Sequence, residues 1–149
     1  MALIKINRNV LSDLVVNEFD PSVGRARRVI NVTATENLPM GTLVFRAKDG
    51  LDLDAPYAPV TDAATQLVAT NELAVVFGDK YSCKEVVEAG KDGVVKAVAF
   101  VGFDVILKDQ MILDVNKIKR DSNEYKALKA ILERQDVILA ETMNVISAK

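Results

Sequence analysis

The 149-residue sequence contains no histidine and no tryptophan, and it has a single cysteine, Cys83. Histidine is the side chain most often used as a general base and a frequent ligand for zinc, so such chemistry would have to rest on carboxylates, lysines or tyrosines. A lone cysteine forms no internal disulfide, and without histidine as its base Cys83 is a poor candidate for a nucleophile. We therefore expect no enzyme activity, no cofactor and no metal site, and synthesis in a cytoplasm.

Motifs for phosphate binding and for acyl transfer are also missing. The sequence has no Gly-x-x-x-x-Gly-Lys, no Gly-x-Gly-x-x-Gly and no Gly-x-Ser-x-Gly. Its net charge of −2 argues against a surface matched to nucleic acid. No run reaches the roughly 18 apolar residues of a membrane span, and the first residues lack the pattern of a signal peptide. We expect neither nucleic acid nor membrane as a partner.

Three aspartates, Asp49, Asp52 and Asp54, lie within six positions and raise the question of calcium. An EF-hand loop has a glycine after its first three liganding positions and a closing glutamate, and this order is absent here. The segment is predicted to be a solvated turn.

What the chain does have is aliphatic residues, because 50% of it is hydrophobic and only 5% aromatic. Two apolar runs, residues 94–101 and 103–107, meet at Gly102, where a strand must bend or bulge. Valines lose side-chain freedom in a helix, so we predict a buried strand pair or one sharply bent strand. Lys96 and Asp104 are expected to reach solvent from its outer face.

Strands are also predicted at residues 29–35, 42–46 and 73–77, each rich in β-branched or aliphatic side chains. Residues 137–140 and 143–146 have the same composition. Turns, loops or breaks are expected at residues 38–41, 61–71 and 108–110. The predicted fold is mainly β: a small β-barrel-like or β-sandwich domain with an extended N-terminal arm and one short C-terminal helix.

The helix is predicted near residues 122–134. Asp121 or Ser122 is the N-cap, and Glu124 complements the helix dipole in the first turn. Apolar side chains recur at helical spacing at Tyr125, Leu128, Ile131 and Leu132. We expect this face to cover a sheet edge or a neighbouring subunit.

The first residues alternate apolar and polar side chains, and no later segment is an obvious pairing partner. We predict an extended arm over residues 1–27 and a β-rich domain over residues 28–149. Such an arm can add a strand to the exposed sheet edge of another protein. The apolar side chains predicted to make that contact are Leu3, Ile4, Ile6, Val10, Leu11, Leu14 and Val15.

Three arginines, Arg25, Arg27 and Arg28, lie at the end of the arm. Nucleic-acid binding would require them to align with other basic residues along a groove, and the sequence offers only the distant group at 117–120. We predict that they line a subunit contact or a solvated rim, since arginine is enriched at interfaces.

Five segments, taken in order, carry a resemblance. They are LSDLVVNE at residues 11–18, RRVINV at 27–32, LPMGTLV at 38–44, AVAFVGF at 97–103 and the helix at 123–134. Together they resemble the lambda-type bacteriophage head decoration, or capsid cement, proteins. The resemblance covers nearly the whole chain, which differs from the shorter family members in its longer arm and in residues 79–88.

The resemblance implies a homotrimer on the outer surface of the virion, at local three-fold positions between hexamers of the major capsid protein. The arm would pair with capsid strands, and the trimers would hold the expanded head against internal DNA pressure. Two other readings of the residues stay open. A trimeric β-rich phage tail or fibre component would have the same composition, and a small β-rich hydrolase would use paired carboxylates brought together by the fold.

Overall fold

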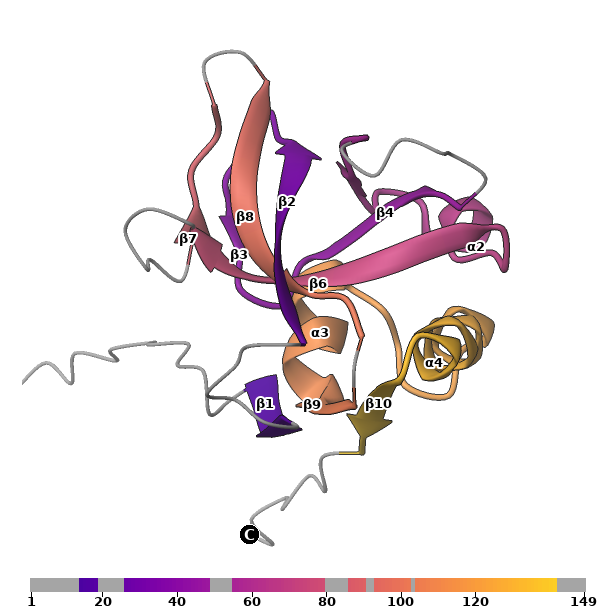
Figure 1. Cartoon of the computed structure of the whole chain (residues 1–149). Helices are drawn as coiled ribbons and strands as arrows, with labels where there is room; N and C mark the ends of the chain where they lie inside the picture. Colours follow the sequence, from indigo (N-terminus) through magenta and orange to yellow (C-terminus); the bar gives the residue numbers. More distant parts are fainter. Residues whose placement is uncertain are drawn as a thin grey trace, which may run out of the picture.

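The structure is a computed structural model, and it describes residues 14–18, 26–48, 55–79, 86–90, 93–102 and 104–141 (Figure 1). This part of the chain forms ten strands in three sheets, with three helices, which confirms the mainly β prediction. The strands are β1 (Val15–Glu18), β2 (Arg27–Thr33), β3 (Leu38–Pro39), β4 (Leu43–Ala47), β5 (Ala58–Pro59), β6 (Asn71–Asp79), β7 (Val86–Val87), β8 (Val94–Phe100), β9 (Val105–Lys108) and β10 (Val137–Ala140). The helices are α2 (Ala63–Gln66), α3 (Asp109–Asn116) and α4 (Asn123–Arg134).

The largest sheet has the order β2-β8-β6-β4-β5, and each pair of neighbours is antiparallel. It curls until Tyr57, next to β5, meets β2 at the opposite edge. The Tyr57 N–H donates to the Asn31 carbonyl at 2.8 Å, and the Thr33 N–H donates to the Tyr57 carbonyl at 2.8 Å. Because this single bridge joins the edges without a continuous ladder, the sheet is barrel-like and not a closed barrel.

Side chains alternate between the two faces of this sheet, so each face has its own core cluster. The inner cluster is built largely from small and β-branched residues that fit inside a tight curve. Its members are Ile30, Val32, Ala34, Leu38, Val44, Tyr57, Ala74, Val76, Val87, Ala97 and Ala99. Leu38 and Val87 come from the two-stranded sheet β3-β7, which therefore packs against this inner face.

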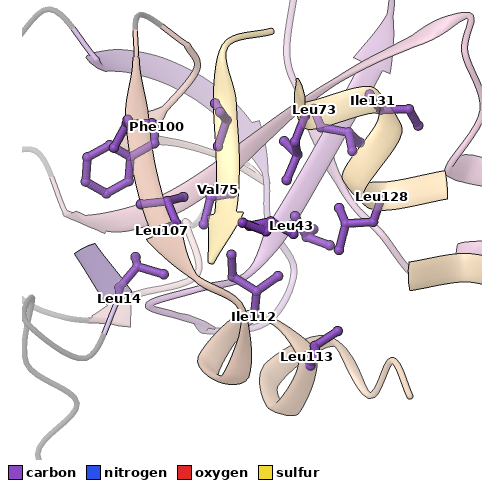
Figure 2. Packing of buried hydrophobic residues seen from close by; sticks show 14 of the residues in the cluster. Leu14, Leu43, Leu73, Val75, Phe100, Leu107, Ile112, Leu113, Leu128 and Ile131 are labelled. Atoms are coloured by element: carbon purple, nitrogen blue, oxygen red, sulfur yellow. The ribbon is translucent and has the colours of Figure 1, made fainter. Parts of the chain in front are cut away.

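The outer cluster joins the other face to the helices and to a second sheet with the order β1-β9-β10. Figure 1 shows α3, α4 and this three-stranded sheet gathered on one side of β6, and Figure 2 shows the packing between them. Its fully buried members include Leu14, Leu43, Leu73, Val75, Phe100, Leu107, Ile112, Leu128, Leu132 and Val137.

The valine-rich stretch bends at Gly102, as its sequence predicts. β8 ends at Phe100 in the five-stranded sheet, and β9 begins at Val105 in the three-stranded sheet. A Cβ atom at Gly102 would lie 2.6 Å from the backbone oxygen of Gln135, so only glycine fits this crossing without a shift. Lys96 and Asp104 are exposed, as predicted.

Helix α4 confirms the helix prediction to within one residue. The Ser122 hydroxyl accepts a hydrogen bond from the Tyr125 N–H at 3.2 Å, which makes Ser122 the N-cap. The four predicted apolar positions, Tyr125, Leu128, Ile131 and Leu132, are all buried against the outer cluster.

One local prediction is wrong and two are incomplete. The break at 108–110 and the apolar residues after it form helix α3, which ends where Lys117 adopts left-handed backbone angles. The predicted loop at 61–71 also contains the short helix α2, and the predicted turn at 38–41 begins with strand β3 and turns at Met40 and Gly41. For α3 and β3 a tertiary contact decides the local structure, since Ile112 and Leu113 of α3 and Leu38 of β3 are buried in the core, whereas α2 buries none of its own residues.

The predicted boundary of the arm at residue 27 also needs correction. Strand β1 pairs antiparallel with β9, and β2 begins at Arg27, so residues 14–18 and Arg27 belong to the folded body. Leu14 is fully buried and Val15 packs against the outer cluster. The pairing partner of β1 is β9, about 90 residues further along the chain, so the sequence around β1 shows no nearby strand with which it could pair.

Candidate interaction site

Strand β1 is clamped to the body at both ends. At its start, Leu14 is buried at the edge of the outer cluster (Figure 2). At its end, the nearly buried carboxylate of Glu18 accepts two hydrogen bonds from Arg27, from Nε to Oε1 at 2.9 Å and from Nη2 to Oε2 at 2.7 Å. This two-point geometry is the strong form of an arginine–carboxylate pair. It fixes β1 against the first residue of β2.

The guanidinium of Arg27 also lies over two aromatic rings. Its central carbon is 5.1 Å from the ring centroid of Phe77 and 5.7 Å from that of Phe100. A cation in this position is attracted by the electron-rich ring faces. The sequence predicts Arg27 to be an interface residue. In the structure its side chain instead joins β1 to β2 within the folded body.

An apolar stripe crosses the outer face of the three-stranded sheet. It consists of Val16 on β1, Ile106 on β9 and Ile138 on β10. Ile106 pairs directly with Ile138, and a β-bulge places Val16 and Asn17 opposite Ile106. Val16 is 51% exposed and Ile138 is 50% exposed, while Ile106 is half-buried. Single exposed aliphatic residues are ordinary, but three neighbours on one sheet face form a candidate contact surface.

A polar rim lies where the two edges of the curled sheet approach each other. The Tyr57 hydroxyl hydrogen bonds to the Glu72 carboxylate, and an Arg46 Nη atom lies 2.8 Å from the same carboxylate. The Arg46 guanidinium also stacks over the Tyr57 ring, 4.5 Å from its centroid. Burial, followed by the bond to Glu72, raises the pKa of Tyr57. These contacts neutralise Arg46 and Glu72 against each other.

Arg28 is exposed on this rim. Beside it is a shallow pocket of about 220 Å³ whose lining includes Lys48, Glu72 and Asp136. The charges are of both signs, and Glu72 is already held by Arg46 and Tyr57. The rim therefore suits a polar protein contact better than acid–base chemistry.

A larger pocket of about 450 Å³ lies between α2 and the connection from α3 to α4. Its lining includes two carboxylates, Asp62 and Glu124. Asp62 accepts a hydrogen bond from the Thr65 hydroxyl at 2.9 Å, and Glu124 occupies the first turn of α4. Both carboxylates thus have structural roles at helix starts.

A buried charge cluster connects α3 to α4. Asp109 is fully buried, and its carboxylate accepts a hydrogen bond from the Tyr125 hydroxyl at 2.8 Å and lies 2.7 Å from a guanidinium nitrogen of Arg120. Burial, followed by the bond to Asp109, raises the pKa of Tyr125. Arg120 is therefore paired with the buried Asp109. Lys117 and Lys119, in contrast, are exposed and line the larger pocket.

The predicted site residues therefore separate into two groups. Leu14, Val15 and Arg27 hold β1 to the body, and Arg28 is exposed on the polar rim. The remaining predicted contact residues lie outside the described part of the chain: Leu3, Ile4, Ile6, Val10, Leu11 and Arg25. The residues that the sequence analysis set aside as metal ligands or nucleophile, Asp49, Asp52, Asp54 and Cys83, also lie outside it. The apolar stripe was not predicted, because it depends on the register between strands that are distant in sequence.

Comparisons with known proteins give no neighbour from which a role can be transferred: no family model, no curated protein and no solved structure matches the chain. Within the described residues, no group of three or more acidic or cysteine side chains is placed to hold a metal ion. No helix in that part of the chain is long and apolar enough to cross a membrane.

Proposed function

We propose that this protein is a structural component of a bacteriophage particle, a decoration protein that binds the outside of the capsid as trimers at local three-fold positions and stabilises the expanded head. Its partners are the major capsid protein and further copies of itself. It acts by binding alone, with no catalytic role and no cofactor. The proposal comes from the resemblance carried by five segments of the sequence.

The observation that supports it most is the rigid mounting of β1. The alternating residues of the arm lead directly into a strand whose start is fixed by the buried Leu14 and whose end is fixed by the Glu18–Arg27 pair. A segment that binds a partner transmits load only if its attachment to the body is firm. The clamped strand β1 provides such an attachment for residues 1–13.

The arm itself must contribute a long contact. Ordering a flexible backbone costs roughly 1–2 kcal/mol per residue, so a segment of ten residues binds only if backbone hydrogen bonds and side-chain burial accumulate along it. Addition to the edge of a capsid strand supplies both, with apolar side chains such as Ile4 and Ile6 entering alternate pockets. The exposed Arg28 on the polar rim offers a further contact from the body.

The test is co-sedimentation with expanded, undecorated capsids. The full chain is expected to saturate them at a fixed ratio, and deletion of residues 1–10 is expected to weaken binding by orders of magnitude while melting temperature and oligomeric state stay the same. Two double variants sharpen the assay. Replacing Ile4 and Ile6 by serine removes apolar side chains from the arm and should weaken capsid binding. Replacing Asn7 and Asn9 by serine is the control, because it changes the same number of positions and removes no apolar side chain.

Each outcome has a definite meaning. If the full chain ignores capsids but joins phage tails, it is a tail or fibre component and the proposal is wrong. If the truncated chain saturates capsids at the same concentration as the full chain, decoration stands but the anchor is the folded body. If truncation prevents folding, the first ten residues belong to the core.

A further inference from the structure

The polar rim of the curled sheet contains two pockets, and Arg28 on β2 lines both of them. The smaller, of about 40 Å³, is also lined by Arg46 and Tyr57. The other is the pocket of about 220 Å³, which we name the rim pocket. The lining of the rim pocket includes Arg28, Lys48, Glu72, Gly102, Gln135 and Asp136.

One wall of the rim pocket is fixed by contacts within the fold. The side-chain amide of Gln135 accepts a hydrogen bond from the Leu73 N–H at 2.9 Å and donates one to the Leu73 carbonyl at 2.7 Å. The backbone carbonyl of Gln135 lies against Gly102, where a Cβ atom would come within 2.6 Å of its oxygen. A wall held in this way is already formed before a ligand arrives, so binding there costs less ordering.

The carboxylate of Glu72 is balanced inside the fold. Its Oε1 atom accepts a hydrogen bond from Arg46 Nε at 3.0 Å and another from the Tyr57 hydroxyl, and Arg46 Nη2 lies 2.8 Å from the same oxygen. Because the positive charge of Arg46 offsets its negative charge, Glu72 repels an incoming anion less than an unpaired carboxylate would.

Two cations of the rim pocket stay available. Arg28 and Lys48 are both exposed, and neither makes a hydrogen bond or an ion pair with another residue in the described part of the chain. With Glu72 balanced by Arg46, the lining presents these two positive charges and the one negative charge of Asp136. The local charge is therefore positive, although the whole chain carries a net charge of −2. Such a pocket attracts a group with a single negative charge.

Size and geometry narrow the choice of ligand. Pockets for drug-sized molecules hold roughly 300–1,000 Å³, so a volume of about 220 Å³ suits one side chain better than a whole small molecule. The planar guanidinium of arginine binds a carboxylate through two parallel hydrogen bonds, and arginine is enriched at protein contacts. A phosphate dianion suits the site less well, because Asp136 and Glu72 both line it.

We propose that the rim pocket binds an acidic side chain, aspartate or glutamate, of a partner protein, with Arg28 and Lys48 holding its carboxylate. The identity of that partner as the major capsid protein rests on the proposed function. The contact lies on the folded body and is separate from any contact that the arm makes.

The first test uses a small probe, N-acetyl-glutamate α-amide, which carries one carboxylate, and follows amide chemical shifts of the full chain by NMR. Shifts are expected at Gly102 and Gln135, with a dissociation constant in the millimolar range, and the uncharged N-acetyl-glutamine α-amide is expected to cause none. Arg28→Gln should weaken probe binding roughly tenfold or more, a change of about 1.4 kcal/mol or more. The matched control is Lys96→Gln, because Lys96 is an exposed cation on β8 that lines neither pocket.

Both substituted residues are exposed, so melting temperature should stay the same for the two variants. The proposal is overturned if Arg28→Gln and Lys96→Gln bind the probe equally well, if the glutamine derivative binds as well as the glutamate one, or if inorganic phosphate binds more tightly than either. Probe binding that appears only after Asp49, Asp52 and Asp54 are replaced by asparagine would assign the pocket to the chain's own aspartates and also overturn it.

The capsid assay separates this inference from the proposed function. Arg28→Glu is expected to weaken co-sedimentation with capsids roughly tenfold or more, and Lys96→Glu is expected to leave it unchanged. If both variants saturate capsids as the full chain does, the contact between the rim pocket and the capsid is overturned and decoration stands. If the full chain binds the glutamate probe at the pocket but never binds capsids, the pocket stands and decoration is overturned.

Discussion

Replacing Leu14 by alanine tests whether the folded body begins at β1. Leu14 is completely buried in the outer cluster, near Leu107 on the paired strand (Figure 2). Buried leucine-to-alanine changes cost about 2–5 kcal/mol, from lost burial and from the cavity that remains. Because Leu14 lies at the edge of the cluster, partial collapse should limit the loss to about 3 kcal/mol. For a domain of this size, that corresponds to a fall in melting temperature of roughly 6–12 °C.

The measurement is urea unfolding followed by circular dichroism. The slope of the unfolding free energy against urea concentration should be the same for variant and wild type, which shows that their unfolded states are comparable. Val94→Ala is the control, because Val94 is 49% exposed and a change there should stay within about 0.5 kcal/mol. If Leu14→Ala is as stable as the control, residues 14–18 are part of a detachable arm, and the mounting of β1 described above is wrong.

Three further results are expected. Gly102→Ala should lose about 1–3 kcal/mol in the same unfolding assay, since its Cβ would lie 2.6 Å from the Gln135 carbonyl oxygen; a neutral effect would mean the crossing is loose. The raised pKa values of Tyr57 and Tyr125 mean that the folded state holds their protons more tightly than the unfolded chain, so stability should be level below about pH 10 and fall at higher pH. Each tyrosine-to-phenylalanine variant should flatten that fall, and an unchanged slope would contradict the assignment. Chelator should leave the melting temperature unchanged, whereas a drop of several degrees would indicate a metal at residues 49–54.

Elements with a local signal were predictable from the sequence. The β-branched runs identify β2, β4, β6 and β8, and the capping serine with its apolar spacing identifies α4. Helix α3 was not predicted for two reasons. Its apolar residues are consecutive and so do not show helical spacing, and its N-cap residue, Lys108, makes no side-chain capping hydrogen bond. Long-range packing supplies what the local sequence leaves undetermined.

The candidate site depended almost entirely on such long-range information. The sequence singles out the arginine group, but it could not distinguish the paired Arg27 from the exposed Arg28. Which of two neighbouring side chains faces inward is set by strand register. The apolar stripe likewise requires Ile106 and Ile138 to be opposite each other, and that pairing follows from the parallel alignment of β9 and β10.

The pairing of β1 with β9 sets the order of events during synthesis. Val15 pairs with Leu107, so 107 − 15 = 92 residues separate the two partners. At a translation rate of about 5–20 residues per second, β1 waits on the order of 5–20 s on the ribosome before its partner strand has been made. Contacts across such a long loop also slow folding after release. Among the strands that the structure describes, the first to be translated is therefore among the last to dock, and the nascent chain carries an unpaired strand edge until then.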